Sequence, residues 1–218
     1  MTTRTVIGTT QQFTIGKIVC LARNYAEHAR ELGNETPAAP VLFMKPASSV
    51  IGDGATVRIP AYSQECHYEI ELAVLIGTQA RTVTVDKALE HVAGYGVAID
   101  MTLRDVQNGL KAKGLPWEIA KGFDTACPLS DFVPVGAIAD PHALQLTLAV
   151  NGEIRQNGTS ADMIHRVAQI IAHISAIFTL EPGDVILTGT PAGVGPVGAG
   201  DVMTAEIATV GCLTIPVA

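Results

Sequence analysis

The sequence Cys66-His67-Tyr68-Glu69-Ile70-Glu71-Leu72-Ala73-Val74-Leu75-Ile76-Gly77 has the composition of a β-strand and carries two acidic residues near its start. Aliphatic and β-branched residues suit a pleat, and Gly77 ends it. Because strand side chains alternate between two faces, Glu69 and Glu71 share one face, roughly 7 Å apart, opposite the apolar face from Tyr68 to Ile76. The two carboxylates repel each other, and the apolar residues around them would raise the pKa of both. A positive charge is therefore expected between them.

A hard divalent cation is one candidate for that charge. Mg²⁺, Mn²⁺ and Ca²⁺ prefer oxygen ligands, and two Glu side chains on one face of a strand can converge on a single ion. The alternative is a solvent-facing edge strand with scattered charges, which the Glu-x-Glu pattern on its own favours.

The size and composition of the chain favour one globular domain. Its 218 residues are 48% hydrophobic, and we predict a single domain over residues 1–218, with residues 1–15 as an N-terminal lead-in. No apolar run approaches the roughly 20 residues needed to cross a bilayer, and the first residues lack the pattern of a signal peptide. The four cysteines are far apart, without Cys-x-x-Cys spacing. These features predict a soluble protein of the reducing cytoplasm, with no membrane partner.

The charge distribution argues against nucleic acid as a partner. The net charge is −7, and the 14 Lys and Arg residues form no cluster in the sequence. A small anionic molecule remains a candidate partner if the few cations converge in space.

A short helix is predicted over residues 24–33, after a buried strand at 18–21. Gly33 marks the C-terminal end of this helix. On this helix His28 and Glu31 are neighbours at positions i and i+3. A carboxylate beside an imidazole orients the ring and raises its basicity, which suits a general base near neutral pH. An ordinary ion pair on an exposed helix is the alternative. We also expect this short, polar helix to act as a lid that orders over substrate.

Further charged residues follow predicted strands and helices. Lys45 ends a strand at 41–45, and Asp100 lies near the end of a strand at 94–102, on a face of very small side chains that leaves room for an ion. Asp100 could equally cap the next helix. That helix, over 103–111, places Arg104 and Gln107 one turn apart, and Lys121 follows. Each of these residues alone is typical of a surface position.

The remaining elements are predicted from local patterns. We expect a short strand at 57–60, a helix at 86–92 capped by Asp86, and a hairpin turning at Asn151-Gly152. Ser160 is expected to cap a long helix whose apolar stripe runs from residue 163 to 178. A strand from residue 185 ends in small polar residues, including Thr190, that suit ligand binding. The glycines after it do not follow a strand-to-helix phosphate loop, which argues against nucleotide binding.

Taken in order, several motifs resemble the fumarylacetoacetate hydrolase family, and within it the acylpyruvase and oxaloacetate decarboxylase type. The resemblance extends from about residue 15 to the C-terminus. The motifs that carry it are Arg23-Asn24-Tyr25 with His28 and Glu31, Phe43-Met44-Lys45-Pro46, Glu69-Ile70-Glu71, Asp100-Met101-Thr102 with Arg104, Asp105 and Gln107, Gly114-Leu115-Pro116-Trp117 with Lys121, and Leu187-Thr188-Gly189-Thr190-Pro191.

The resemblance implies a mostly β fold with a few helices, a mixed β-sandwich or β-roll, usually as a homodimer. It implies Mg²⁺ or Mn²⁺ held by Glu69, Glu71 and Asp100, a position that Ca²⁺ could take in a crystal. It further implies a catalytic dyad of His28 and Glu31. The implied substrate contacts come from Arg104, Gln107, Lys121 and Thr190. Arg23 and Lys45 are implied to be substrate-binding residues in supporting roles. Lys121 is also implied to stabilise negative charge in catalysis.

These residues would act on a small 2-oxo acid. Three carboxylates on one octahedral ion leave about three positions open, enough for a bidentate 2-oxo acid and a water. The implied reactions are hydrolysis of acylpyruvates to pyruvate and a carboxylic acid, and decarboxylation of oxaloacetate, both through a pyruvate enolate that the metal stabilises as a Lewis acid. One alternative is an isomerase or decarboxylase of 2-hydroxy-dienedioates from aromatic catabolism. Another is a non-catalytic β-domain in which the metal is structural.

Overall fold

A computed structural model describes residues 2–31, 33 and 38–218. Its largest sheet has six strands in the order β11-β8-β7-β14-β3-β4. In this sheet β14 runs parallel to β3 and antiparallel to β7, and the other pairs are antiparallel. The strands are β3 (Ile18–Ala22), β4 (Val41–Lys45), β7 (Ile70–Ile76), β8 (Val92–Ile99), β11 (Val133–Pro134) and β14 (Val185–Leu187).

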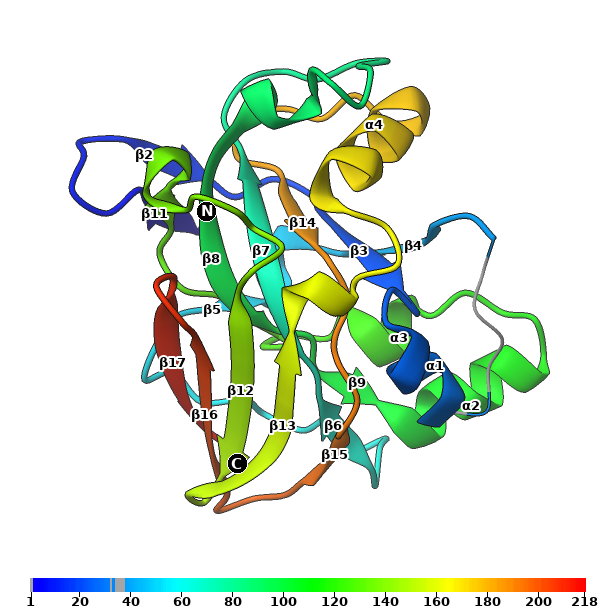
Figure 1. The fold of residues 1–218 in the computed structure, drawn as a ribbon. Helices are drawn as coiled ribbons and strands as arrows, with labels where there is room; N and C mark the ends of the chain where they lie inside the picture. The colour runs from blue at the N-terminus through cyan, green and yellow to red at the C-terminus, as the bar shows by residue number, and fades with distance from the viewer. Residues whose placement is uncertain (1, 32, 34–37) are drawn as a thin grey trace.

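A second sheet is antiparallel, with four strands in the order β13-β12-β16-β17. Figure 1 shows these strands beside β7 and β8. Three smaller sheets complete the β structure, pairing β1 with β2, β5 with β10, and β6 with both β15 and β9. The strands are β12 (Gln145–Val150), β13 (Glu153–Thr159), β16 (Val202–Ile207), β17 (Gly211–Pro216), β1 (Thr3–Thr5), β2 (Gln12–Thr14), β5 (Val50–Ile51), β10 (Cys127–Pro128), β6 (Cys66–Tyr68), β15 (Gly195–Val197) and β9 (Thr102–Leu103).

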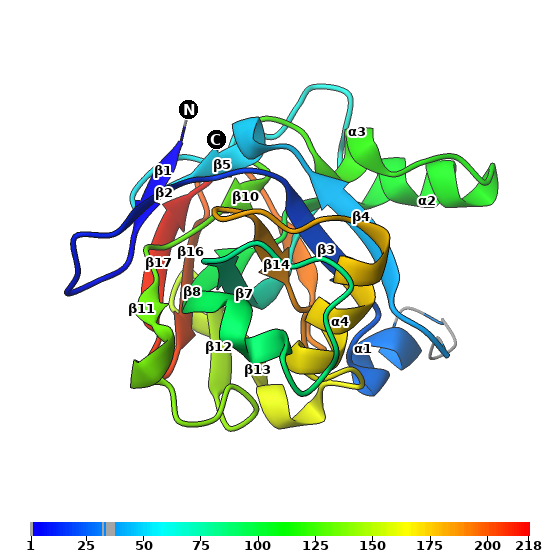
Figure 2. The same cartoon turned by 90° about the horizontal axis from the view of Figure 1, so that it is seen from above.

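Three of the helices lie on the same side of the molecule in Figure 1, and Figure 2 shows that the first of them is nearer to the fourth helix than to the other two. They are α1 (Ala26–Glu31), α2 (Arg104–Ala112) and α3 (Glu118–Lys121), whereas α4 (Val167–Ile177) packs against the short 3₁₀ helix at Ala88–His91. Other 3₁₀ turns lie at Ala47–Ser49, Val135–Ala137 and Ser160–Asp162. The predicted mostly β fold with a few helices is confirmed.

The predicted alternation of β7 separates two apolar cores. Leu72 and Val74 pack in the larger core, where they join Leu146 and Met203 of the second sheet. Ala73 and Leu75 face a smaller core on the opposite side of the strand. All seven residues of β7 are buried, which excludes the solvent-facing edge strand that was the alternative.

The register of the β7–β8 pair brings the acidic residues together. Ile70 lies opposite Ile99 and Glu71 opposite Ala98. The strand is interrupted at residue 69, and on the other side of this break His67 lies opposite Thr102. The pairing therefore keeps one register across the break. The predicted strand over 66–76 is interrupted at residue 69, because β6 pairs with β9 and β15 whereas β7 pairs with β8 and β14.

Several local predictions need correction. The helix expected from Ser160 begins only at Val167, where the N–H of Arg166 donates to Gln169 Oε1 at 2.8 Å. Ser160 instead pairs with the start of β12, since its Oγ accepts a hydrogen bond from the N–H of Leu144 at 2.9 Å.

The predicted helix at 86–92 is a four-residue 3₁₀ turn without a side-chain cap, and so the Asp86 cap is wrong. The predicted strand at 57–60 is reduced to one bridge between Val57 and Val217. The hairpin at Asn151-Gly152 is confirmed, and both residues have the positive φ, 52° and 82°, that a tight hairpin turn of this kind requires.

Candidate active site

One pocket gathers most of the residues singled out in the sequence. Its walls come from the ends of β3, β4 and β7, from α1, α2 and α3, and from the segment after β14. The lining residues are Leu21, Ala22, Arg23, His28, Phe43, Glu69, Glu71, Arg104, Gln107, Lys111, Trp117, Lys121 and Thr190.

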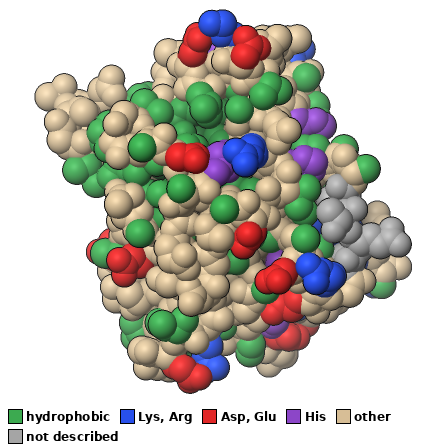
Figure 3. Space-filling model, viewed as in Figure 1, with side chains coloured by type: hydrophobic (Ala, Val, Ile, Leu, Met, Phe, Trp, Pro, Cys, Tyr) green, Lys and Arg blue, Asp and Glu red, His purple; other side chains and the backbone are tan. Residues whose placement is uncertain are grey.

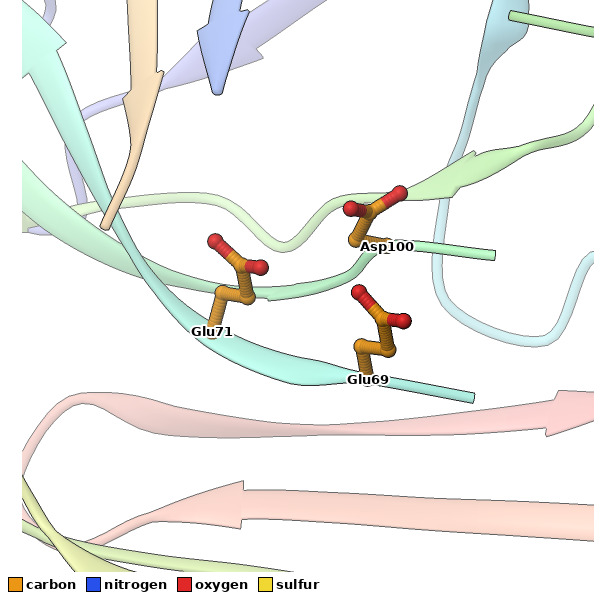
Figure 4. A group of neighbouring side chains, drawn as sticks. All are labelled: Glu69, Glu71 and Asp100. Atoms are coloured by element: carbon orange, nitrogen blue, oxygen red, sulfur yellow. The ribbon is translucent and has the colours of Figure 1, made fainter. Parts of the chain in front are cut away.

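The three predicted metal ligands lie together, and two of them, Glu69 and Glu71, line this pocket. Glu69, Glu71 and Asp100 are buried, and each offers a carboxylate oxygen within 4.8 Å of the others. Figure 4 shows Glu71 on β7, Glu69 just before this strand and Asp100 on the neighbouring stretch of chain, just after β8, with the three carboxylates close together. The strand register explains the arrangement. The N–H of Asp100 donates to the carbonyl of Glu69 at 2.8 Å, which makes the two residues cross-strand neighbours.

A positive side chain lies between Glu69 and Asp100, and not between Glu69 and Glu71, where the sequence predicted one. Lys121 Nζ is 2.9 Å from Glu69 Oε2 and 2.6 Å from Asp100 Oδ2, and Arg104 pairs with the other oxygen of Glu69. Burial opposes the charged form of Glu69, but Lys121 and Arg104 outweigh it and hold its pKa well below the ordinary value. Burial likewise opposes the charge of Lys121, but Asp100 and Glu69 raise its pKa.

Glu71 is in a different electrostatic position. Among the described residues no Lys, Arg or His side chain forms an ion pair with it, and its Oε2 accepts one hydrogen bond, from the N–H of Gly189 at 2.6 Å. Burial, followed by the charges of Asp100 and Glu69, raises its pKa well above the ordinary value. Gly189 can make this bond because its φ of 91° suits glycine, and a Cβ there would lie 2.8 Å from the Cβ of Asn24.

Lys45 lies behind Asp100 and is outside the pocket wall. Its Nζ donates to the main-chain carbonyls of Met101 at 3.1 Å, Ala126 at 3.0 Å and Lys121, which uses its three protons. Asp100 Oδ1 is 2.7 Å from this ammonium group but accepts no hydrogen bond. Lys45, predicted among the substrate-binding residues, therefore supports Asp100 and the surrounding backbone.

The acidic group fits a hard divalent cation. Glu71 is a buried carboxylate without a cationic partner in the described chain, whereas Asp100 Oδ1 forms an ion pair with Lys45 Nζ at 2.7 Å. The uncompensated carboxylate of Glu71 disfavours the metal-free state, and a cation that takes oxygen ligands would relieve it. The expectation that Asp100 caps the following helix is not met, because that helix has no side-chain cap.

The predicted dyad forms at the pocket wall. His28 Nδ1 is 3.2 Å from Glu31 Oε2, and the other oxygen of Glu31 accepts a hydrogen bond from the N–H of Gly193 at 3.0 Å. His28 is 6% exposed, so this is no ordinary surface ion pair. With Nδ1 held by the carboxylate, the imidazole Nε2 remains for proton transfer. The helix that carries this dyad, α1, is shorter than predicted. Leu32, within the predicted helix, lies outside the described residues. The role of α1 as a lid stays a prediction.

Three of the residues predicted to bind substrate are held in place by side-chain hydrogen bonds. Arg104 Nη1 donates to Gln107 Oε1 at 2.7 Å. Thr190 Oγ1 accepts a hydrogen bond from the amide nitrogen of Gln156 at 2.8 Å, and Gln156 Oε1 accepts the N–H of Ile70 at 2.9 Å. Because Gln156 fills an acceptor position on Thr190, the hydroxyl proton of Thr190 is left to point elsewhere.

Sequence reasoning missed three parts of this site. Lys111 lines the pocket, and its position seven residues after Arg104 on α2 was the one available signal. Phe43 and Trp117 were noticed only as motif residues, yet their rings are 5.9 Å apart in the wall and Lys121 Nζ lies 4.8 Å from the centre of the Phe43 ring. Gln156, on β13, carried no signal at all.

On the face drawn in Figure 3, the described Lys and Arg side chains are scattered and form no basic stripe. None of the described helices combines the length and apolar character that crossing a membrane would require.

The chain belongs to the fumarylacetoacetate hydrolase family. The family profile, described as fumarylacetoacetate (FAA) hydrolase C-terminal, matches residues 17–218, which confirms the resemblance seen in the motifs. Among its relatives is the mitochondrial oxaloacetate tautomerase FAHD1 of Bos taurus, 51% identical over 190 residues that make up 87% of this chain and 86% of the relative.

Two solved structures are close to this fold. The fumarylpyruvate hydrolase of Pseudomonas aeruginosa, in complex with Mn²⁺ and pyruvate, has a TM-score of 0.94 and 38% identity, covering 99% of this chain and 95% of that one. The 5-carboxymethyl-2-hydroxymuconate delta-isomerase of Mycobacterium smegmatis has a TM-score of 0.84 and 35% identity, covering 96% and 85%.

Proposed function

We propose that this chain is a Mg²⁺- or Mn²⁺-dependent enzyme that cleaves acylpyruvates to pyruvate and a carboxylic acid, decarboxylates oxaloacetate, or does both. The observation that carries the proposal is the meeting of three buried carboxylates with a His28–Glu31 pair at one pocket. The structural neighbour that binds Mn²⁺ and pyruvate supports the proposed ion and the pyruvate product. We further propose one catalytic domain over residues 1–218, acting as a homodimer.

Glu69, Glu71 and Asp100 would hold the ion. When bound, it would act as a Lewis acid that draws electrons toward the 2-oxo group of the substrate. The charge balance favours an anionic substrate. The three carboxylates, when ionised, carry three negative charges, and the neighbouring cations Lys45, Arg104 and Lys121 carry three positive charges. A bound divalent ion would therefore give the site an excess positive charge.

In the proposed hydrolysis, His28 acts as general base. Its Nε2 takes a proton from a water whose oxygen attacks the C4 ketone, while Glu31 holds Nδ1 and stabilises the imidazolium. The bond between C3 and C4 then breaks, C4 leaves as a carboxylic acid, and the electron pair passes into the enolate of pyruvate. The ammonium group of Lys121 stabilises the negative charge, and the proton held by His28 returns to C3.

The same residues could serve two reactions that need no water. In oxaloacetate the C3–C4 bond breaks with loss of CO₂, and protonation of C3 gives pyruvate. Keto–enol interconversion of oxaloacetate moves one proton between C3 and the 2-oxo oxygen, which His28 could carry. The name of the Bos taurus relative favours this tautomerase activity, and the Mycobacterium smegmatis neighbour favours the related isomerisation of 2-hydroxy-dienedioates.

One assay tests the proposal. Purified protein loaded with Mn²⁺ or Mg²⁺ is given acetylpyruvate and oxaloacetate in parallel, and pyruvate release and enol absorbance are followed with and without a chelator. We expect metal-dependent turnover of at least one substrate. If neither substrate reacts and chelation unfolds the protein, the ion is structural and the enzymatic proposal fails.

A further inference from the structure

The guanidinium group of Arg104 is held by three protein side chains. Its Nη1 donates to Gln107 Oε1 at 2.7 Å, its Nη2 pairs with Glu69, and its Nε donates to His67 Nδ1 at 3.4 Å. A guanidinium group has five N–H donors, so one proton on Nη1 and one on Nη2 have no partner among these three residues. Because Arg104 lines the pocket, these two protons remain for a ligand bound there.

Of these three partners, His67 is the one outside the pocket wall. Gln107 and Glu69 both line the pocket, where Glu69 is a proposed metal ligand and Gln107 a predicted substrate contact. His67 lies on β6, its side chain is 11% exposed, and it does not line the pocket. Its hold on Arg104 therefore does not compete with the binding of an ion or a substrate, and His67 can influence a bound substrate only through a neighbouring residue.

The contacts of His67 determine which ring nitrogen carries its proton. An Arg side chain only donates hydrogen bonds, so His67 Nδ1 accepts from Arg104 Nε and carries no proton. His67 Nε2 lies 2.8 Å from Glu65 Oε1, and a carboxylate only accepts, so Nε2 carries the proton and donates it to Glu65. The imidazole is therefore the Nε2–H tautomer, with a donor at one nitrogen and an acceptor at the other.

The main chain ties the start of α2 to the same short segment. The N–H of Arg104 donates to the carbonyl of Glu65 at 2.7 Å, and Asp105 Oδ1 accepts a hydrogen bond from Ser63 Oγ at 2.7 Å. These bonds fix the backbone at Arg104 but leave its long side chain free to rotate. The orientation of the guanidinium group therefore depends on its side-chain partners, and His67 holds the Nε edge.

We propose that His67 is a positioning residue that acts through Arg104 and orients its guanidinium group toward the carboxylate of the substrate. This inference rests on the proposed function, because it takes Arg104 to bind the carboxylate of a 2-oxo acid. An Arg side chain has many rotamers, and holding it in one of them before the substrate arrives removes that entropy cost from binding. A guanidinium group held in a fixed plane also suits the planar geometry of a carboxylate.

The first test compares two substitutions of nearly equal shape. His67→Asn keeps an acceptor near the position of Nδ1, whereas His67→Leu removes it, so His67→Asn is the matched control. Calorimetric titration of Mn²⁺-saturated protein with pyruvate measures binding without turnover. We expect His67→Leu to weaken pyruvate binding about 10-fold, about 1.4 kcal/mol, and His67→Asn to weaken it less than about 3-fold. Equal weakening by both substitutions overturns the inference, and so does a parent protein that binds no pyruvate.

The second test asks whether the effect passes through Arg104. In an Arg104→Met background, His67→Leu should change pyruvate affinity less than about 2-fold, because the residue that His67 positions is gone. A loss as large as in the parent would show that His67 acts by another route. Titration with Mn²⁺ alone should give affinities for His67→Leu and the parent within about 3-fold of each other, and a loss matching that for pyruvate would place the effect at the ion instead.

The tautomer of His67 gives a readout that does not depend on binding. Nitrogen-15 spectra of Mg²⁺-loaded, histidine-labelled protein distinguish protonated from unprotonated ring nitrogens, and the signals lost in His67→Asn are those of His67. Mg²⁺ replaces Mn²⁺ here because Mn²⁺ broadens the signals of nearby nuclei. We expect a protonated Nε2 and an unprotonated Nδ1 at neutral pH. A proton on Nδ1 would exclude the hydrogen bond from Arg104 and overturn the inference.

The outcome is distinct from a failure of the proposed function. A protein that shows these binding results but releases no pyruvate from any acylpyruvate or from oxaloacetate would keep the positioning role of His67 and lose the proposed reactions. A protein that turns over these substrates while His67→Leu binds pyruvate as tightly as the parent would do the reverse. Thermal unfolding of each variant with Mn²⁺ excludes loss of fold as the cause.

Discussion

Two glutamates that lie two residues apart should respond in opposite ways to loss of charge. Glu69 is paired with Lys121 and Arg104, whereas Glu71 accepts only the N–H of Gly189 and has no cationic partner among the described residues. We expect Glu71→Gln to stabilise the metal-free protein and Glu69→Gln to destabilise it. Both substitutions should weaken binding of the divalent ion, because each removes a charged ligand.

The size of the effect at Glu71 follows from its raised pKa. A carboxyl group whose pKa is raised on folding costs stability as the pH rises from its unfolded pKa, 4.5, toward its folded pKa. About 2.5 pH units separate this value from pH 7, so the cost at pH 7 is at most about 3.5 kcal/mol at about 1.4 kcal/mol per unit. The amide of Gln can still accept the N–H of Gly189 and can donate to a neighbouring carboxylate, so most of that cost should be recovered.

At Glu69 the same change leaves two buried cations short of a partner. Removing one member of a buried ion pair typically costs about 3–5 kcal/mol. Denaturant unfolding in a chelator at pH 7 should therefore give a higher free energy of unfolding for Glu71→Gln, by about 1–3 kcal/mol, and a lower one for Glu69→Gln. The gain at Glu71 should shrink as the pH falls toward 4.5, because the carboxyl group then becomes protonated in the unfolded state as well as in the folded state. Equal destabilisation by both substitutions would refute the assignment of Glu71 as the uncompensated carboxylate.

Two further substitutions test the catalytic dyad and the support of the pocket. His28→Ala should lower acylpyruvate hydrolysis by roughly 10²–10⁴-fold, as expected for loss of a general base, and should affect oxaloacetate decarboxylation less; equal hydrolysis by variant and parent would exclude His28 as the base. Gln156→Leu leaves the N–H of Ile70 and the oxygen of Thr190 without their partner, and should lower the free energy of unfolding by about 2–4 kcal/mol and raise KM. Gln156→Glu, which keeps the acceptor for Ile70, is the control; a loss below 1 kcal/mol for Gln156→Leu would contradict this role.

Local patterns predicted the parts of the fold that depend on neighbouring residues. The period-two alternation of residues 70–76 assigned the correct face to every residue of β7, because both faces of this strand pack against apolar cores. The hairpin at Asn151-Gly152 followed from the backbone conformation that these two residues tolerate. The dyad spacing likewise depends only on helical geometry.

The predictions that failed were decided by distant partners. Ser160 has the side chain of a helix cap, but both its N–H and its hydroxyl bind Leu144, sixteen residues earlier. The break at Glu69 reflects the pairing of β6 with β15, a strand near the C-terminus, which leaves no trace in the residues around Glu69. Gln156 joins Ile70 to Thr190 across three distant segments, so the residues adjacent to it in the sequence carried no signal.

The cross-strand position of Asp100 gives the proposed ion a mechanical role as well as a chemical one. Glu71 lies on β7, Glu69 lies at the break before it and Asp100 directly follows β8, so a single ion bound by all three would connect the two strands at the point where their ladder is interrupted. Such a connection closes the loop of chain between residues 71 and 100 and removes the entropy that this loop would gain on opening. Loss of the ion would therefore loosen the pocket floor first, while the six-stranded sheet beneath it keeps its hydrogen bonds.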